Sequence, residues 1–491
     1  MKRVHDRVLH LHDTLEARLK PVVPENGTSL GFYCCGPTVY GPAHIGNFRT
    51  FVVQDLFRRV VELSGFATRH VRNVTDVDDK TIRESQAQSM SLEAFTAHWK
   101  DRFHEDGRAL NLLPPHEEPS AVAHIEEQIH WIKRLVDHDI AYRAEDGSVY
   151  FRVAAFADYG RLTGLKDREL KPSASKRSQL SDEYEKDALA DFALWKAHKP
   201  EDGPYAWESP WGRGRPGWHI ECTAMSVKCL GQAFDVHSGG IDLIFPHHEN
   251  EIAQCEAVTH KPLARHWFHI AHLLVEGTKM SKSLGNLYTL KDLEEKGYKG
   301  AEVRYALLMG HYRQSLNFTF SSLKAARQGL QRMSKVANRL LQQVGRTGLA
   351  SYEECLSRAG KEKAWGPFIG VWEALLKDLN APKALGALFS ALGPLERSDA
   401  LSDEEAAIAL QGLEFCVAVL GWPLPKAEEK KRDEDSEIPE SINAMAEKRW
   451  QAKKERDWQA ADALRDELKA LGWIVRDQSD SYKLERVAVN G

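Results

Sequence analysis

The sequence lacks the features that would place the protein in or beyond a membrane. No stretch is both apolar and long enough to cross a bilayer, and the polar residues 1–6 are not followed by the apolar segment of a secretory signal. The seven cysteines are scattered and include no Cys-x-x-Cys pair, so we expect no disulfide framework. We therefore expect a cytoplasmic protein without membrane partners, whose thiols are reduced and are buried or bound to metal.

The sequence also lacks an excess of charge of one sign. The formal net charge is only -5 at pH 7, so no global field attracts nucleic acid, and any contact with RNA must come from local basic patches. Net charge therefore neither supports nor excludes an RNA partner. With 491 residues, of which 42% are hydrophobic, the chain is long enough for about three domains with cores of their own.

The N-terminal part of the chain has the pattern of a parallel α/β unit. Residues 30–35 and 69–74 predict strands, and the apolar positions four apart within residues 44–63 predict an amphipathic helix between them. A strand, a helix and a strand of these lengths favour a parallel crossover, whose loops open at the sheet edge where such folds bind ligands. Strand character returns at residues 217–222 and 234–237, before a helix that a proline could start.

These patterns predict an α/β fold class with several parts. We predict a Rossmann-like parallel-sheet domain with an insertion, a helical bundle, a charged linker and a small C-terminal α+β domain. In the last domain, Asp457 is expected to cap a helix whose packed face includes Trp458. The predicted sheet domain spans residues 1–322, with the insertion at about 113–211 and a nucleotide loop region at about 265–322. The helical bundle is predicted at residues 323–425, the charged linker at 426–437 and the C-terminal domain at 438–491.

Two short segments predict a site for the phosphates of ATP. In residues 42–47, His44 offers a donor at a helix start, and Gly46 allows the nucleotide to approach the backbone closely. In residues 279–283, two lysines would supply mobile positive charge on a loop that closes over ATP. A lone histidine at a helix start is usually a cap, and a loop rich in lysine and serine is usually solvated. Their occurrence together favours the nucleotide site.

Between these segments lies a candidate metal site. His247 and Glu251 are four residues apart, so a helix would project both from one face. Cys35 at a strand end and Cys222 would add two thiolates, and such a ligand set suits zinc. Spacing alone leaves this open, because the four residues are distant in the chain and each cysteine could be a buried, inert thiol.

Together, the motifs resemble those of bacterial cysteinyl-tRNA synthetases, which are class I aminoacyl-tRNA synthetases, over almost the whole chain. The resemblance is carried by residues 33–40, 44–47, 73–80, 217–222, 245–251 and 279–283. The family's usual His-Ile-Gly-His signature ends here in Asn47, which keeps a short neutral donor but cannot become cationic.

The resemblance implies a role for each candidate residue. Zinc would be held by Cys35, Cys222, His247 and Glu251, whereas Cys34, its neighbour on the strand, would face the opposite way. The implied catalytic residues are His44, Asn47, Lys279 and Lys282, and the implied ATP contacts are His44, Gly46, Asn47, Lys279, Ser281 and Lys282. Trp218 would form a wall of the amino-acid pocket, and the candidates for polar contacts, each of which could equally serve packing or a turn, are Thr75, His237 and Asp242.

The resemblance also implies a cysteine–tRNA ligase that is a monomer with one zinc ion per chain. It would use L-cysteine and ATP with Mg²⁺, and tRNA(Cys) would bind partly through a C-terminal anticodon-binding region with a basic stripe. That stripe comprises Lys448, Arg449, Lys453, Lys454 and Arg456. Two alternatives remain: a shorter-type ligase that passes cysteine to an amino sugar, and a non-catalytic RNA-binding paralogue that keeps the fold.

Overall fold

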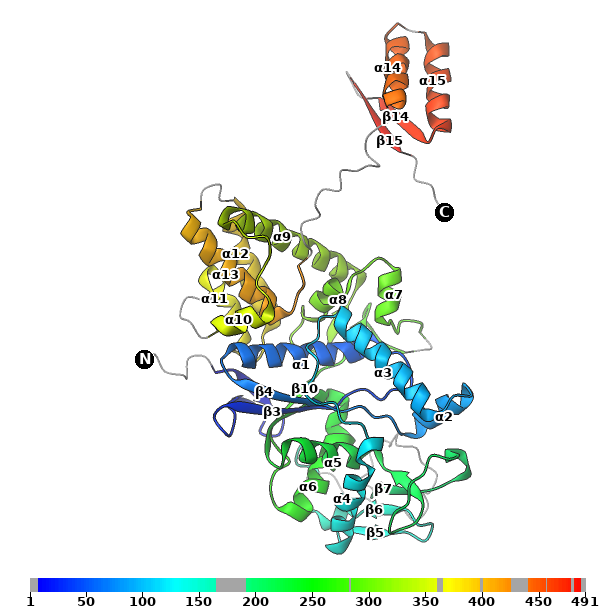
Figure 1. The fold of residues 1–491 in the computed structure, drawn as a ribbon, viewed down its shortest axis with the longest axis vertical. Coiled ribbons are helices and arrows are strands. Elements are labelled where there is room, and N and C mark those ends of the chain that lie inside the picture. Colours follow the sequence, from blue (N-terminus) through cyan, green and yellow to red (C-terminus); the bar gives the residue numbers. More distant parts are fainter. Residues whose placement is uncertain are drawn as a thin grey trace. The chain divides into compact units, whose positions relative to one another are not determined.

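The computed structural model describes residues 8–164, 191–281, 284–359, 365–397, 401–424, 440–455, 457–477 and 481–486. The chain divides into two compact units, Met1–Pro425 and Lys426–Gly491 (Figure 1). None of the described helices is both long and apolar enough to cross a membrane. The predicted linker, residues 426–437, lies outside the described residues.

A four-stranded parallel sheet forms the centre of the first unit. Its strands run in the order β10-β9-β3-β4, and helix α1 connects β3 to β4. This arrangement confirms the predicted α/β fold class. The bounds are β3 (Ser29–Cys34), α1 (Ile45–Leu63), β4 (Ala67–Arg72), β9 (Phe234–Gly240) and β10 (Ala264–Ile270).

Helices cover both faces of this sheet (Figure 1). The apolar residues of α1, such as Phe48, Val52 and Leu56, are buried in one core against the sheet, as their spacing predicts. A second core lies on the other face, beneath three further helices. These helices are α4 (Ile125–Asp137), α5 (Trp218–Leu230) and α6 (Glu249–Thr259).

The strand predicted at residues 217–222 is wrong, because this segment is the start of helix α5. Apolar and polar residues alternate there, which is the pattern of a half-exposed strand. In the folded chain the polar His219 and Glu221 are as deeply buried as Ile220 and Cys222, so the alternation does not mark one solvated face. The following helix, α6, begins at Glu249 after a short turn that contains Pro246.

The insertion contains a four-stranded antiparallel sheet in the order β5-β6-β7-β8. Its buried Phe151 and Trp195 belong to the same core as Ile220 of α5. Lys196 pairs with Asp79 at 2.8 Å and so connects the insertion to helix α2. The bounds are α2 (Asp79–Ala87), α3 (Leu92–Ala109), β5 (Ala141–Arg143), β6 (Val149–Phe151), β7 (Phe192–Ala197) and β8 (Gly214–Pro216).

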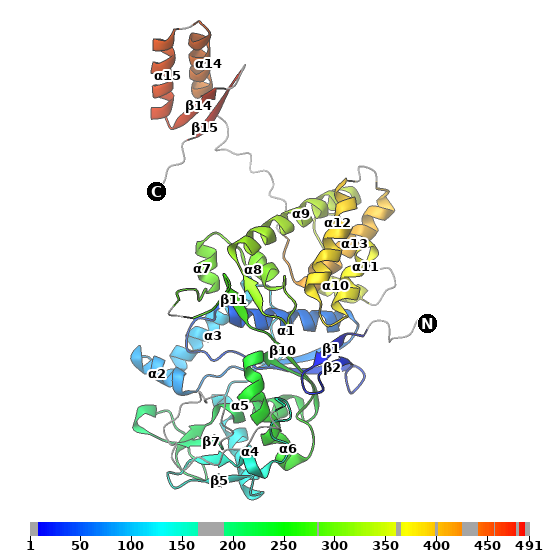
Figure 2. The same ribbon diagram turned by 180° about the vertical axis from the view of Figure 1, so that it is seen from behind.

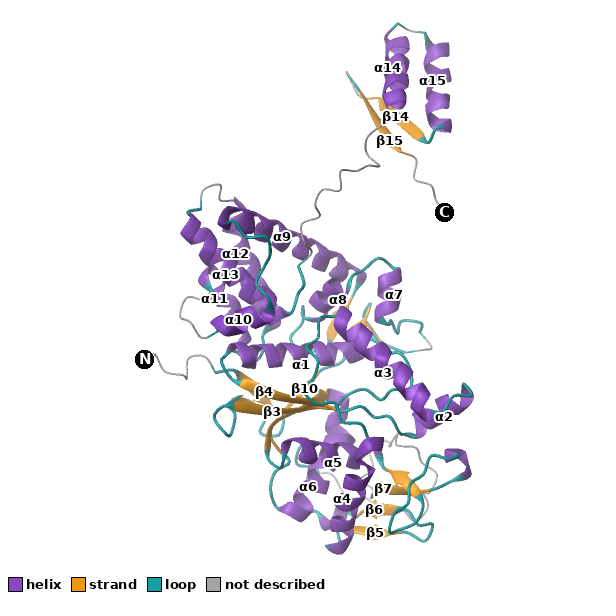
Figure 3. Cartoon of the chain, viewed as in Figure 1, coloured by secondary structure: helices purple, strands orange, loops and turns teal. Residues whose placement is uncertain are grey.

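The rest of the first unit is a small sheet and a helical bundle (Figure 3). The small sheet has the order β12-β11-β13 and lies with α7 and α8 beside the bundle (Figure 2). Its elements are β11 (Leu273–Val275), β12 (Thr278–Lys279), α7 (Leu290–Glu295), α8 (Gly300–Leu307) and β13 (Leu316–Phe318). The bundle comprises α9 (Phe320–Val344), α10 (Tyr352–Arg358), α11 (Ile369–Leu375), α12 (Ala381–Arg397) and α13 (Asp403–Leu420). The first unit also contains an N-terminal hairpin, which consists of β1 (His10–Asp13) and β2 (Arg18–Pro21).

The second unit pairs two helices with a hairpin and has its own small core of Ile442, Ala446, Leu468 and Trp473. Asp457 caps α15 by accepting a hydrogen bond from the Ala460 N–H at 3.1 Å. Trp458 is 58% exposed, so its predicted place on the packed face is wrong. Helical side chains lean towards the N-terminus, so a side chain at the first position extends past the helix. The bounds are α14 (Glu440–Lys454), α15 (Trp458–Ala470), β14 (Trp473–Asp477) and β15 (Tyr482–Arg486).

Candidate functional site

The site predicted from sequence lies at the carboxyl edge of the parallel sheet. Cys35 directly follows β3, and the chain then reaches His44 at the start of α1. Thr75 follows β4, and Asp242 follows β9. Since these strands are parallel neighbours, their carboxyl ends meet at one edge, where open α/β sheets bind ligands.

The structure brings together the four side chains proposed to hold zinc. The two thiols of Cys35 and Cys222 lie 3.9 Å apart, and His247 Nε2 lies 3.1 Å from Glu251 Oε1. All four residues are buried, and the ligand atoms that they offer lie within 4.8 Å of one another. They come from three parts of the chain: Cys35 follows β3, Cys222 lies in α5, and His247 and Glu251 lie in the turn before α6 and in α6 itself.

The donor set fits a zinc ion in chemistry and in spacing. A tetrahedral site with zinc–sulfur bonds of about 2.3 Å and zinc–nitrogen bonds of about 2.0 Å holds its ligand atoms about 3.3 to 3.8 Å apart. The separations of 3.1 to 3.9 Å between the side chains here are close to that range. Two sulfurs, one imidazole and one carboxylate are also ligands that zinc prefers.

The neighbouring Cys34 is directed away from this site. Cys34 is buried in the core between α1 and the sheet, whereas Cys35 belongs to the core on the opposite face. This difference follows from the strand geometry, because successive side chains of a strand point to opposite faces. Of the two adjacent thiols, only Cys35 is close to the other three ligand residues.

A second set of four residues overlaps the first. Cys35 and Glu251 also meet His237 and His248 within the same 4.8 Å limit. His237 Nε2 lies 2.9 Å from the second oxygen of Glu251, and His248 Nε2 lies 3.2 Å from the Cys35 sulfur. His237, which was predicted to contact the substrate, therefore lies against the Glu251 carboxylate.

Sequence reasoning missed two further histidines of this buried cluster. His219 Nδ1 lies 2.9 Å from His247 Nδ1, which leaves the Nε2 atom of His247 for the ligand position. His269 Nε2 lies 2.7 Å from His248 Nδ1. His219 could have been found from its motif, residues 217–222, but His269 lies in β10, where no local pattern marks it.

The surroundings favour the charged forms of two ligand residues. Burial opposes ionisation of Glu251, but the charges of His237 and His247 lower its pKa to about 2. A hydrogen bond from Cys35 outweighs burial and lowers the pKa of the Cys222 thiol to about 6. Carboxylate and thiolate are the forms that bind a metal ion.

The signature segment forms a reciprocal cap at the start of α1. The Asn47 N–H donates to His44 Nδ1 at 3.2 Å, and the His44 N–H donates to Asn47 Oδ1 at 3.1 Å. Asn47, the residue that departs from the family signature, thus has a structural contact. It holds the His44 backbone at the helix N-terminus.

The lysine-rich loop lies beside this cap. The Ile45 N–H donates to the Tyr288 carbonyl at 2.9 Å, and Met280 packs towards Gly46. Lys279 is exposed, and the Ser281 N–H donates to Asn286 Oδ1 at 2.9 Å. Lys282, the other predicted catalytic lysine, lies outside the described residues.

Replacing Gly46 with alanine is expected to weaken ATP binding. The added Cβ would overlap the Met280 methyl group and stand 3.0 Å from two atoms of the His44 ring. We expect the KM for ATP in pyrophosphate exchange to rise roughly tenfold, which corresponds to about 1.4 kcal/mol. Gly386→Ala in α12 is the matched control, because its Cβ would meet nothing within 4 Å. An unchanged KM for Gly46→Ala would contradict the close approach of nucleotide to this backbone.

The other predicted pocket residues have partners in the structure. Trp218 stacks on the His247 ring with centroids 4.3 Å apart, and the Thr75 hydroxyl donates to Glu221 Oε2 at 3.1 Å. Burial lowers the pKa of the His44 imidazole, and the negative charge of Asp242 opposes part of this shift. Trp218 therefore lies directly over one of the proposed ligands.

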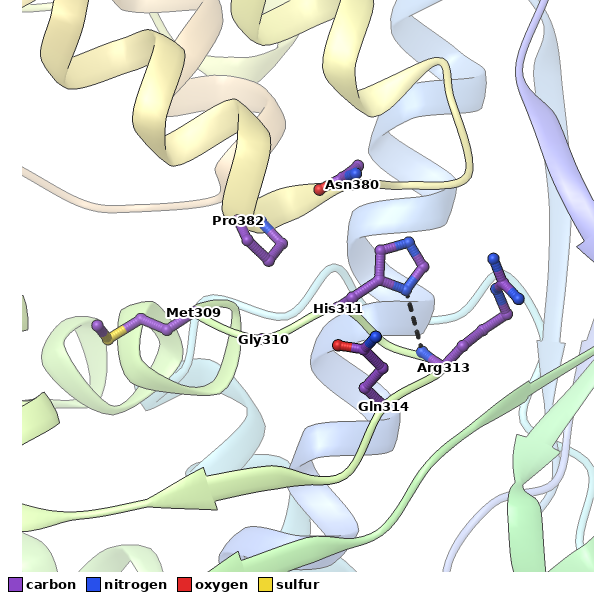
Figure 4. Close-up of a pocket in the computed structure, with 7 residues that line it drawn as sticks. All are labelled: Met309, Gly310, His311, Arg313, Gln314, Asn380 and Pro382. Atoms are coloured by element: carbon purple, nitrogen blue, oxygen red, sulfur yellow. Dashed lines mark hydrogen bonds between the residues drawn. The ribbon is translucent and has the colours of Figure 1, made fainter.

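A cavity of about 600 Å³ lies between the end of α8 and the start of α12 (Figure 4). It is lined by Met309, Gly310, His311, Arg313, Gln314, Asn380 and Pro382. None of the residues predicted for the ATP, cysteine or zinc sites lines it. This cavity is thus separate from the candidate site.

Comparison with known proteins shows which families this chain is similar to. Residues 21–328 match the model of the class I (C) catalytic domain of tRNA synthetases, and residues 435–482 match that of the cysteinyl-tRNA ligase anticodon binding domain. A cysteine–tRNA ligase of Opitutus terrae is 49% identical over 97% of this chain and 99% of the relative. A cysteine–tRNA ligase of Chlamydia caviae is 41% identical over 98% of each chain.

Solved structures of lower identity share the fold. A methionyl-tRNA synthetase of Mycobacterium tuberculosis in complex with methionyl-adenylate matches with a TM-score of 0.57 and 16% identity, over 80% of this chain and 90% of that chain. A ternary complex of Agrobacterium radiobacter LeuRS matches with a TM-score of 0.56 and 11% identity, over 83% and 88%. At such identities, these likenesses bear on the fold alone.

Proposed function

This chain belongs to the cysteine–tRNA ligase family of class I aminoacyl-tRNA synthetases, and on that premise we propose how its site works. It activates L-cysteine with ATP to cysteinyl-adenylate and transfers the cysteinyl group to the 3′ end of tRNA(Cys). The observation that carries this proposal is the convergence of Cys35, Cys222, His247 and Glu251 at the sheet edge that also presents His44. This convergence supports a metal site that selects the substrate thiol at the same sheet edge as the segment proposed to bind ATP.

The first step forms a bond between cysteine and AMP. The cysteine carboxylate attacks the α-phosphate of ATP, which carries Mg²⁺, and pyrophosphate leaves. The chain contributes mainly by positioning and by stabilising negative charge. His44 and Asn47 at the N-terminus of α1 offer neutral donors, and Lys279 and Lys282 offer positive charge on the loop. In the second step, a terminal ribose hydroxyl of the tRNA takes the acyl group and AMP leaves.

Selection of cysteine is a problem of ligand chemistry rather than of shape. Serine and alanine differ from cysteine by little volume, and a difference of about one methylene yields only roughly 10- to 200-fold discrimination. Zinc held by the four side chains would act as a Lewis acid that binds a thiolate sulfur far more readily than a hydroxyl oxygen. Trp218 forms a wall of the amino-acid pocket, and Thr75, His237 and Asp242 complete it. Discrimination of this kind needs no separate editing domain.

The C-terminal unit is proposed to bind the anticodon of tRNA(Cys). Of its basic stripe, Arg449 and Lys453 both pair with Asp477, so their charge is partly neutralised. Lys454 lies over the Trp450 ring at 5.6 Å, and Arg456 lies outside the described residues. The anticodon-domain match favours tRNA over the alternative amino-sugar acceptor. We further propose that the enzyme acts as a monomer in the cytoplasm.

A pyrophosphate exchange assay with cysteine and with serine, run beside a metal determination, tests this function. We expect ATP-dependent exchange with cysteine, discrimination against serine well beyond the 200-fold limit of shape selection, and about one zinc ion per chain. Transfer to tRNA(Cys), but not to an amino sugar, should follow. Protein that contains no metal and yet selects cysteine equally well would refute the role of the four ligands.

A further inference from the structure

Tyr33 in β3 has a polar group that the proposed mechanism does not use. Its side chain is fully buried, and its hydroxyl has no hydrogen-bond partner among the described residues. A buried hydroxyl without a partner costs roughly 1 to 3 kcal/mol, and native proteins contain few such groups. A hydrogen-bond acceptor for this hydroxyl would therefore stabilise the protein.

The strand geometry directs Tyr33 towards the candidate metal site. Residues two apart in a strand share a face, so Tyr33 lies on the same face as Cys35. Tyr33 is also buried in the core that contains Cys222. Its ring meets the His237 ring edge-on with centroids 5.2 Å apart, and His237 in turn contacts Glu251.

Of the two thiols, Cys222 is the better acceptor for this hydroxyl. The Cys35 sulfur already contacts His248 Nε2 at 3.2 Å. It also lies 3.8 Å from Glu251 Oε1. Cys222 is buried in the same core as Tyr33, and the Tyr33 hydroxyl has no hydrogen-bond partner among the described residues.

We propose that the Tyr33 hydroxyl donates a hydrogen bond to the Cys222 thiolate when zinc occupies the four-residue site. Tyr33 is then a positioning residue for the metal. Two thiolates and one carboxylate carry more negative charge than a zinc ion neutralises, so a neutral donor to one sulfur stabilises the site. Groups that hydrogen-bond to metal ligands also fix their orientation. This inference rests on the ligand set of the proposed function.

The test is Tyr33→Phe in the full-length, zinc-loaded protein, which removes only the hydroxyl oxygen. We expect zinc affinity to fall roughly 10- to 100-fold, measured as faster transfer of zinc to a chelator. Tyr312→Phe is the matched control, because that buried hydroxyl donates to Asp378 at 2.6 Å, away from the metal ligands. Tyr312→Phe should lower thermal stability and leave zinc transfer unchanged.

A spectrum of the cobalt-substituted protein separates this role from a merely structural one. Tyr33→Phe should shift the sulfur-to-cobalt charge-transfer band, because the electron density on the Cys222 sulfur changes, whereas Tyr312→Phe should not. Wild-type zinc transfer and an unshifted band in Tyr33→Phe would overturn the proposal. A higher KM for cysteine with unchanged zinc transfer would also overturn it, because Tyr33 would then contact the substrate. If Cys222→Ser kept zinc, the four-ligand site of the proposed function would be wrong, whatever the result for Tyr33.

Discussion

Cys222→Ser is expected to strip the protein of zinc and to raise the KM for cysteine in pyrophosphate exchange by more than about 100-fold. The Cys222 sulfur lies 3.9 Å from that of Cys35 and is fully enclosed by the first unit. Mutation of a residue that only hydrogen-bonds to a metal ligand already lowers metal affinity roughly 10- to 100-fold. Loss of a ligand should exceed that, because serine's hydroxyl is a poor zinc ligand at neutral pH. Metal analysis and exchange kinetics with cysteine are the measurements.

Cys229→Ser is the matched control for this variant. Cys229 lies in the same helix, α5, is only partly buried and belongs to neither candidate metal group. It should keep zinc and its cysteine requirement. If Cys222→Ser instead retained stoichiometric zinc and an unaltered KM, the four-ligand assignment would be wrong and selection of the thiol would need another explanation.

Deletion of the residues after Glu437 should reduce aminoacylation of tRNA(Cys) about 10²- to 10⁴-fold while leaving adenylate formation unchanged. The removed unit has its own core, and the cores of the first unit include none of its residues. A second binding module that is covalently linked raises overall affinity by about this factor. The effect should appear mainly in the KM for tRNA.

Both half-reactions of the truncated protein must be measured together. Pyrophosphate exchange with cysteine serves as the internal control, since the sheet edge with Cys35, His44 and Cys222 lies entirely in the first unit. An equal loss of exchange and of tRNA charging would contradict the division of labour between the two units. Unchanged tRNA charging would show that the C-terminal unit is not needed for recognition of tRNA(Cys).

Local pattern was sufficient where the apolar residues of an element keep a helical spacing. Phe48, Val52 and Leu56 recur four apart and so predicted helix α1, although polar residues of that helix are buried as well. The pattern failed at residues 217–222, where apolar and polar residues alternate as in a strand although the segment starts a helix and His219 and Glu221 are buried with Ile220 and Cys222. It also failed at Trp458, whose exposure depends on where helix α15 begins rather than on its periodicity.

The sequence by itself determined the fold class, the family and the chemical types that a metal site would need, since motifs and ligand chemistry are properties of residue identity and order. Only the tertiary structure decided that two thiols, an imidazole and a carboxylate from three separate parts of the chain meet within 4.8 Å. It also showed that His219 and His269 contact this cluster and that the Tyr33 hydroxyl has no hydrogen-bond partner among the described residues. The physical reason is that proximity across a core depends on how a sheet and its helices pack, and spacing along the chain does not record that distance.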